Sequence, residues 1–490
     1  MEIVIISMLA FAAALVAIAS ALVLSQIARS AAGRMFQALM WLLALASTTA
    51  VITSGRSLRL VDAALQIEVE GEVASALTAK VILALAIGFA VVLGAVHVLS
   101  SWWRNPPLDR FAMRGLRRPT DIGLALMVFY VAFSIVPFAL ASDHFFHVSL
   151  FYPFFIFLAL LLWLPYSEVD PVVVIKQTLG VLVLGSLVAA VVVPQLALQP
   201  GYAGLVPGFN QRLWGITATA NTLGSCALAL FMIEACEPTQ HRWLHWLLGA
   251  GAVIAMAMSQ SKAAIGTATL GLTLIVSWRW LLVMKNSAAG HGGRGTLTAI
   301  LSFVVVATLF VAGTWFAIAE PQLFGSLGHK LDSRAVADLS TGTGRTFIWK
   351  FAIDAGLESP IFGHGANFWG LETRLRTGLT GATHAHNQFL QVFSRSGFLG
   401  LLSYLWFFSL LVVYAWRALG PTRGGSLAFL LVFFLRSLVE VPLQPNSVLG
   451  GEFFAFMMLL VYVIDRGAKS RVAAADAVVK LPPSLGRIRT

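Results

Sequence analysis

Long apolar runs separated by short polar segments occupy most of the chain. Many of these runs reach the length of about 18 residues at which a helix can cross a hydrocarbon core of roughly 30 Å. They are continuous and rich in Leu, Ala and Val, whereas the strands of an outer-membrane barrel alternate apolar with polar residues. The pattern therefore predicts an all-α polytopic integral membrane protein.

We expect about thirteen membrane-spanning helices, and twelve or fourteen also fit the pattern. They are placed at residues 3–25, 35–54, 79–99, 120–141, 148–165, 172–194, 214–234, 243–258, 263–284, 297–319, 397–416, 425–442 and 448–465. The first run has no basic region before it and continues to about Leu24, which favours a membrane helix over a cleaved signal peptide.

Composition agrees with this class, since 58% of the 490 residues are hydrophobic and only 11% are charged. Soluble domains average about 25% charged residues. The two cysteines, Cys226 and Cys236, lie on one predicted helix, about 15 Å apart at helical rise, and cannot form a disulfide there. They therefore say nothing about the redox compartment.

The distribution of basic residues explains the net charge of +11 by membrane topology rather than by a nucleic-acid-binding surface. One set of loops contains Arg29, Arg34, Arg104, Arg110, Arg114, Arg117, Arg118, Arg242, Lys285, Arg294, Arg417, Arg423 and the tail from Arg466 to Arg489. The opposite short loops contain Arg56, Arg59, Lys80, Arg212 and Lys262. The positive-inside rule then predicts a cytoplasmic C-terminus and an outer N-terminus.

One predicted outer loop, residues 320–396, is long enough to hold structure of its own. The expected layout is membrane helices over 1–319, this loop, further membrane helices over 397–465 and a basic cytoplasmic tail over 466–490. Within the loop, "GRTFIWKFAIDAGLESP" predicts an amphipathic helix with Ile348, Phe351, Ala352 and Ala355 on one face.

Four basic residues on the predicted outer side are candidates for binding a phosphate-bearing lipid: Arg212, Lys262, Arg345 and Arg436. For Lys262 and Arg345, snorkelling to the membrane interface is an alternative. Arg436 lies four residues before Glu440 on a predicted membrane helix, which predicts an intramembrane ion pair. Such a pair is either functional or a structural device that fixes helix packing.

The stretch "GATHAHNQFLQVFSRSGFLGLL", residues 381–402, concentrates polar and titratable groups before an apolar run. A neutral imidazole of His384 or His386 can take a proton from an attacking hydroxyl. Zinc binding is an alternative for "HAH", but no third ligand stands at a recognisable zinc spacing. The chain also lacks a nucleotide-binding loop and a G-x-S-x-G motif, so we expect neither a metal nor a cofactor.

The same stretch resembles the hallmark of the bacterial O-antigen ligase and polysaccharide polymerase superfamily. His386 and Asn387 are followed by nine residues, then Gly397 and, four further on, Leu401. Upstream, "GRTFIW" and "SPIFGHG" look like the motifs that precede the family's histidine in a large periplasmic loop. One departure is Lys262, where an Arg is common in the family.

This resemblance implies an inverting, metal-independent membrane glycosyltransferase with a fold of the lipid-donor type. It would move a glycan from undecaprenyl pyrophosphate to an acceptor hydroxyl at the periplasmic face of the bacterial inner membrane. His386 would be the general base, while Arg345, Lys262 and Arg212 would bind the donor pyrophosphate. We assign supporting roles to His384, Asn387, Arg436 and Glu440.

Two acceptors fit the resemblance. The style of the loop motifs favours polymerisation of exopolysaccharide or O-antigen repeat units, with a flippase and a chain-length regulator as partners. The alternative is an O-antigen ligase that attaches the glycan to lipid A-core. A third reading from another class, a polysaccharide or lipid transporter, is disfavoured because no internal repeat is detectable and the polar residues gather at one face.

Overall fold

The computed structural model describes residues 2–54, 56, 58, 77–104, 120–141, 148–202, 210–287, 345–379, 382–444 and 452–479. These residues form an almost entirely helical structure, and the expected helix 297–319 lies outside them. The longer helices are α1 (Glu2–Thr53), α3 (Leu77–Arg104), α4 (Thr120–Tyr130), α6 (Tyr152–Trp163), α7 (Pro171–Val192), α9 (Ala220–Cys236), α10 (Arg242–Ser259), α11 (Lys262–Ser287), α15 (Arg345–Glu358), α17 (Gln388–Arg417), α18 (Gly425–Val439) and α19 (Phe453–Val479).

The short elements are α5 (Val136–Leu140), α8 (Pro194–Ala197), α16 (Leu371–Thr377), the 3₁₀ turns Val148–Phe151 and Leu164–Tyr166, and the π-helical turn Val131–Ile135. Strands β1 (Leu198–Pro200) and β2 (Gln211–Leu213) pair antiparallel, with Gln199 opposite Arg212. This strand pair was not predicted from the sequence.

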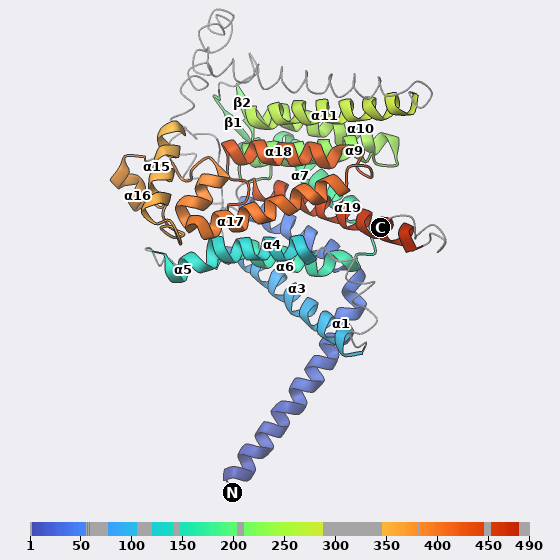
Figure 1. Ribbon diagram of the computed structural model, residues 1–490, viewed down its shortest axis with the longest axis vertical. Coiled ribbons are helices and arrows are strands. Elements are labelled where there is room, and N and C mark those ends of the chain that lie inside the picture. Colours follow the sequence, from blue (N-terminus) through green and yellow to red (C-terminus); the bar gives the residue numbers. More distant parts are fainter. Residues whose placement is uncertain are drawn as a thin grey trace, which may run out of the picture.

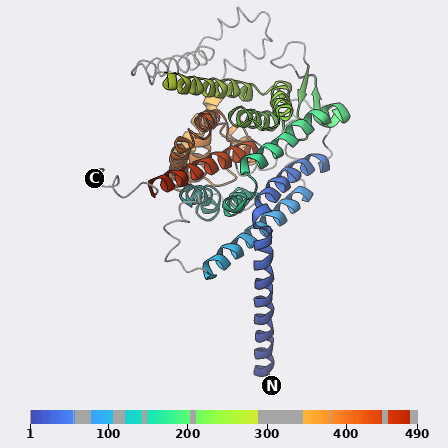
Figure 2. The same cartoon turned by 90° about the vertical axis from the view of Figure 1, so that its right-hand side faces the viewer.

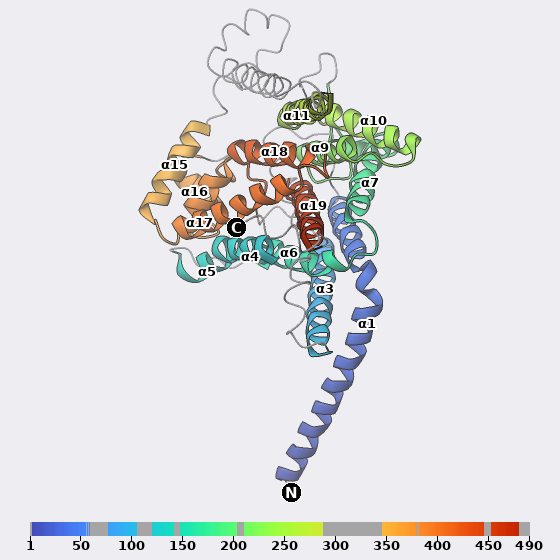
Figure 3. The same cartoon turned by 45° about the vertical axis from the view of Figure 1, so that its right-hand side comes forward.

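Most of the long helices lie side by side as one bundle, and the N-terminal part of α1 extends away from it (Figures 1 and 2). Helices α15 and α16 lie at one end of the bundle, beside the start of α17 (Figures 1 and 3). The loop helix predicted around residues 344–360 therefore exists as α15, and Ile348, Ala352 and Ala355 are on its buried face as expected.

Among the described residues, five helical segments are long and apolar enough to cross a membrane. They are Gln26–Thr53, Leu77–Ser100, Asp121–Leu140, Pro171–Val192 and Gln388–Arg417. Three shorter apolar helical segments, Tyr152–Tyr166, Ala220–Cys236 and Gly425–Val439, accompany them. The described part of the chain is thus almost entirely helical and has membrane-helix character, while the expected number of thirteen spans remains a prediction.

Several expected boundaries differ from the structure, and three of these differences bear on the fold and the site. Residues 3–25 and 35–54 belong to one helix, α1, because the polar segment between them contains good helix formers and no proline. Helix α17 begins at Gln388 rather than at 397, so residues 388–396 of the polar motif are helical while His384 and His386 precede the helix. Helix α18 ends at Val439, which places Glu440 just beyond its end rather than within it.

Helix α17 is broken at Gly397, whose φ of 60° and ψ of −156° are essentially restricted to glycine. At the break, the Phe398 and Leu399 amides donate to the carbonyls of Pro360 and Ile361, at 2.6 and 3.3 Å. A Cβ on Gly397 would lie 2.5 Å from the backbone of Ile361. The "SPIFGHG" segment therefore packs backbone-to-backbone into the break, which explains why a glycine stands at this spacing from the histidine.

Helices α11 and α18 run antiparallel, since Gly424 lies against Trp278 and Gly271 lies against Val432. Continuing this register places Lys262, the first residue of α11, level with the end of α18 near Glu440. The opposite end of α18 begins beside Cys236, at the end of α9. The bundle therefore has a site end, where α17 begins and α18 ends, and an opposite end.

We predict that Gly397→Ala destabilises the protein by more than the roughly 1–3 kcal/mol of the unfavourable backbone geometry, because the new methyl also meets backbone atoms. Gly249→Ala in α10 is the matched control, since no atom lies within 4 Å of the added Cβ. The control is expected to be neutral or slightly stabilising, as for alanine in an ordinary helix. Thermal unfolding of both purified variants in detergent measures the difference, and equal midpoints would contradict the constraint.

Candidate functional site

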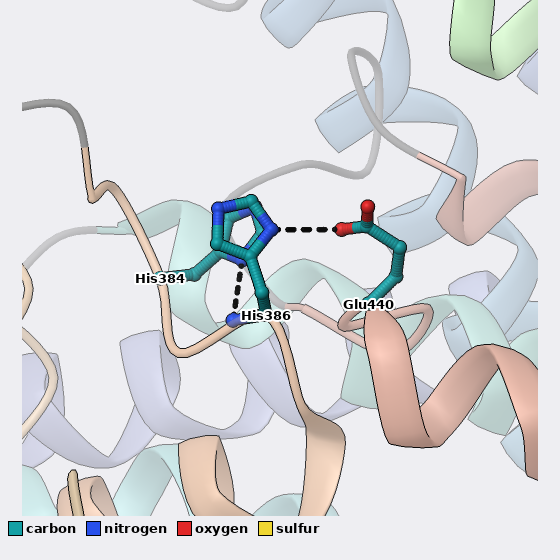
Figure 4. Close-up of side chains that lie close together, drawn as sticks. All are labelled: His384, His386 and Glu440. Atoms are coloured by element: carbon teal, nitrogen blue, oxygen red, sulfur yellow. Dashed lines mark hydrogen bonds and ion pairs between the residues drawn. The ribbon is translucent and has the colours of Figure 1, made fainter. Parts of the chain in front are cut away.

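His386 lies at the site end of the bundle, on the short segment that leads into α17 (Figure 4). Its φ of 47° puts it in the left-handed region, which a non-glycine residue adopts at an energetic cost. The neighbouring backbone is held in place because the Ala385 amide donates to the Gln391 side chain at 2.8 Å. The imidazole is therefore presented in a defined direction at the start of the helix.

Glu440 is the central polar contact of His386. Its carboxylate accepts from Nδ1 of His386 at 3.2 Å, and its other oxygen is 3.2 Å from Nη2 of Arg345. A carboxylate accepts rather than donates, so the proton of neutral His386 is assigned to Nδ1. Nε2 then carries the lone pair, which is the form of imidazole that can act as a base. All three side chains are partly accessible, with 21 to 27% of their surface exposed.

Electrostatics keep Glu440 ionised. Burial alone would raise the pKa of its carboxyl, but the hydrogen bond and charge of His386, together with the charge of Arg436, outweigh it. The resulting pKa is about 2. The carboxylate therefore carries its charge throughout the physiological range and can stabilise an imidazolium.

His384 forms a hydrogen bond with the backbone of His386 and not with its ring nitrogens. The His386 amide donates to Nδ1 of His384 at 3.1 Å, and the two ring centroids are 4.0 Å apart (Figure 4). Burial lowers the pKa of His384 to about 3, and the adjacent His386 acts in the same direction. His384 is therefore a neutral acceptor, and the two histidines have different environments.

The polar side chains of Asn387 and Gln388 form hydrogen bonds with backbone groups. Asn387 caps α17 by accepting from the amides of Phe389 and Leu390, and its Nδ2 donates to the Leu438 carbonyl at 3.1 Å. Gln388 accepts from the amide of Leu443 at 3.0 Å. These bonds join the start of α17 to the end of α18 and so bring His386 and Glu440 together.

The predicted Arg436–Glu440 ion pair is not the main contact of either residue. Glu440 pairs with His386 and Arg345, while Nε of buried Arg436 donates to Glu452 at 3.2 Å and Nη2 makes a closer contact with the same carboxylate. The ion pairs observed instead join distant segments, Arg436 to Glu452 and Glu440 to His386 and Arg345, and helical spacing does not reveal such contacts. Glu452, an acid inside a predicted membrane helix, was itself a signal for such a partner.

Arg212 and Lys262 form a neighbouring basic group rather than part of the His386 contacts. Nε of Arg212 on β2 donates to the Ser259 carbonyl at 3.0 Å, and Nη2 donates to Asn221 at 2.9 Å. Lys262 is exposed three residues after Ser259, at the start of α11. The antiparallel register of α11 and α18 places this group at the site end of the bundle.

One set of donors within the described residues could hold a metal ion. The donor atoms of His384, His386 and Glu440 lie within 4.8 Å of one another. The third ligand comes from a distant part of the chain, which sequence spacing could not reveal. However, the Arg345 guanidinium on the same carboxylate opposes a bound cation electrostatically, so these groups fit acid–base chemistry better.

A groove of about 840 Å³ lies along α7, lined by apolar residues such as Val181, Leu184 and Val188. Its polar rim contains Glu237 and Arg466, whose Nε donates to Glu237 at 2.9 Å. Glu237 follows Cys236, which packs against the beginning of α18. This rim is therefore at the opposite end of the bundle from His386, and the groove has no part in the site.

Comparison with known families now adds to this geometry. Residues 247–405 match the family described as O-antigen ligase. The match includes α15, the break in α17, Arg345, His386 and Asn387. This match supports the resemblance of this part of the chain to the O-antigen ligase and polysaccharide polymerase superfamily, a class of glycan-transfer enzymes. No curated protein matches the chain significantly.

The low pKa of His384 predicts a pH-dependent contribution to stability. An unfolded histidine with a pKa near 6.5 binds a proton that folded His384, with a pKa of about 3, does not bind. Wild type should therefore lose stability as pH falls from about 6.5, by at most about 1.4 kcal/mol per pH unit from this group. His384→Asn, whose Oδ1 can replace Nδ1 as acceptor, should have a shallower dependence.

Denaturation curves at pH 5, 6 and 7 measure this difference. His241→Asn is the matched control, because His241 is exposed at the N-terminus of α10 and its side chain makes no capping hydrogen bond. Its curves should parallel wild type. A parallel dependence for His384→Asn as well would show that His384 does not stay neutral on folding.

Proposed function

We propose that the protein is a metal-independent, inverting glycosyltransferase that moves a glycan from undecaprenyl pyrophosphate to an acceptor sugar hydroxyl. The observation that carries the proposal is the His386–Glu440 pair beside Arg345. His386 and Arg345 lie within the segment that matches the O-antigen ligase family. The His386 imidazole can act as a base, the Glu440 carboxylate orients that imidazole, and the Arg345 guanidinium can bind a phosphate. Glycan transfer from a lipid diphosphate uses each of these three groups.

In the proposed reaction, Nε2 of His386 removes the proton of the acceptor hydroxyl as its oxygen attacks the anomeric carbon. The bond from that carbon to the diphosphate oxygen breaks on the opposite face, which inverts the configuration. The proton remains on His386, and Glu440 stabilises the imidazolium through Nδ1. The products are a glycosidic bond and undecaprenyl diphosphate, which leaves with the bonding electron pair.

The leaving diphosphate gains negative charge as the bond breaks, and fixed cations stabilise that charge. Arg345 is placed for this role because its side chain is partly exposed and its bond to Glu440 uses only Nη2. Lys262 is exposed at the same end of the bundle and supplies a second charge. Arg212 donates hydrogen bonds to the Ser259 carbonyl and to Asn221. In the proposed reaction its role is to stabilise the turn between α10 and α11.

The proposed setting is the bacterial inner membrane, with the site facing the periplasm and the C-terminus in the cytoplasm. Basic residues dominate the loops on the opposite side, as the positive-inside rule requires of cytoplasmic loops. The proposed layout keeps membrane helices over 1–319 and 397–465, a periplasmic loop over 320–396 and a basic tail over 466–490. In this setting α15 and His386 are on the side where lipid-linked glycans are presented.

We favour polymerisation of exopolysaccharide or O-antigen repeat units as the specific activity, with a flippase and a chain-length regulator as partners. The second candidate is ligation of the glycan to lipid A-core, which the description of the matched family supports. Polysaccharide analysis of a deletion strain distinguishes them. Loss of the polymer itself indicates a polymerase, and loss only of its attachment to lipid A-core indicates a ligase.

Replacing His386 with Ala should abolish transfer from a purified lipid-linked donor, because the acceptor hydroxyl loses its base. Rates should fall by about 10² to 10⁴ or more, as when a general base is removed. His241→Ala, at an exposed histidine of the opposite end, should keep full activity. The assay contains no energy source, so transport cannot supply the signal, and full activity in a correctly inserted His386→Ala protein would rule out the general-base role.

Glu440→Gln should lower kcat by a factor on the order of 10² or more, because an amide cannot stabilise the imidazolium and can favour the wrong tautomer of His386. Replacing Arg345 should lower kcat as well as raise KM for the donor, with Ala more harmful than Lys since Lys keeps the charge. Glu372→Gln, at an exposed acid on α16, is the control and should match wild type. Equal kinetics for Glu440→Gln and Glu372→Gln would contradict the positioning role of Glu440.

A further inference from the structure

Helix α15 carries apolar residues on two opposite faces. Ile348, Ala352 and Ala355 are buried, and α15 packs against α17 with Gly356 next to Phe393. On the outward face, Phe347 and Leu357 are 76% and 60% exposed. Ile353 and Ile361, the latter just after the helix, are exposed as well, at 42% and 62%. Large apolar side chains gathered on one exposed face usually mark an interaction surface.

The exposed apolar face of α15, defined by Phe347, Ile353, Leu357 and Ile361, is continuous with the apolar surface of α17. Ile361 accepts the Leu399 amide, which places it directly beside the break in α17, a helix long and apolar enough to cross a membrane. From there, the exposed apolar side chains of Phe398, Leu402, Leu405 and Trp406 continue along that helix. The surface of a membrane-spanning helix that is apolar and exposed is the surface that contacts lipid.

The direction of α15 and its charged residues indicate how deep it lies. The helix runs across the direction of α17 and α18 at the site end of the bundle (Figures 1 and 3), so it lies along the plane of a membrane crossed by those helices. Lys350 and Asp354 are exposed on the same side as the apolar residues. Lys350 can extend its charged end to the headgroups while its apolar stem lies along the acyl-chain boundary.

We propose that the exposed apolar face of α15 docks on the outer surface of the lipid bilayer, with Phe347, Leu357 and Ile361 at the acyl-chain boundary. The occupant of this face is therefore membrane lipid, bound through apolar contact and without a specific headgroup. This inference does not depend on the proposed reaction. A consequence that does rest on the proposed function is that Arg345, the first residue of α15, is held at the depth of a lipid diphosphate.

Site-directed spin labelling of the full chain in nanodiscs tests the docking. Single cysteines replace Phe347 and Leu357, and the native Cys226 and Cys236 are buried. Leu402→Cys on the exposed apolar surface of α17 is the lipid-facing reference, and Gln240→Cys in the exposed turn before α10 is the aqueous reference. Collision rates with oxygen report lipid, and those with a water-soluble nickel chelate report water.

Labels at 347 and 357 should collide with the nickel chelate severalfold less than the label at 240, and with oxygen about as often as the label at 402. Nickel accessibility equal to that at 240 would overturn the proposal and leave the face open to water. Low accessibility to both reagents would also overturn it, because protein rather than lipid would then cover the face. Glycan transfer plays no part in these readings, so they stand apart from the test of His386.

Discussion

The carboxylate of Glu440 is the contact on which the candidate site depends. It joins His386 and Arg345, which lie 54 and 95 positions away along the chain. A charge in a half-buried position loses hydration, and this cost is offset only when several good partners surround it. Two hydrogen-bonded partners and the nearby charge of Arg436 supply this compensation. Removing any one of them leaves the remaining charges less well matched.

Backbone geometry brings these side chains together. Asn387 caps α17 and also bonds the last turn of α18, so the ends of the two helices are joined one residue from His386 and two residues from Glu440. On the other side of the motif, Gly397 opens α17 to the "SPIFGHG" segment that follows α15. The fold therefore requires a glycine at this position. Its distance from His386 along the chain determines where the "SPIFGHG" segment packs against α17.

The sequence predicted the features that depend on local pattern: helical membrane character, helix α15 with its buried face and the His386 motif. It did not predict which acid meets which base. Arg436 and Glu440 have the spacing of a helical pair, but Arg436 pairs with Glu452, and Glu440 pairs with His386 and Arg345 from distant segments. The break at Gly397 and the β1–β2 pair also depend on contacts between distant segments, which periodicity does not encode.

His386 combines a left-handed backbone with a side chain that must point at an acceptor. Such a conformation costs on the order of 1–3 kcal/mol and persists only when its surroundings fix it. Here the Ala385 amide donates a hydrogen bond to the Gln391 side chain, and the His386 amide donates one to the His384 ring. These two bonds fix the backbone of residues 385 and 386. A neutral His384 suits this task better than a charged one, because only an unprotonated Nδ1 can accept the amide. Burial therefore keeps His384 neutral, and neutral His384 holds the His386 backbone that sets the direction of the His386 imidazole.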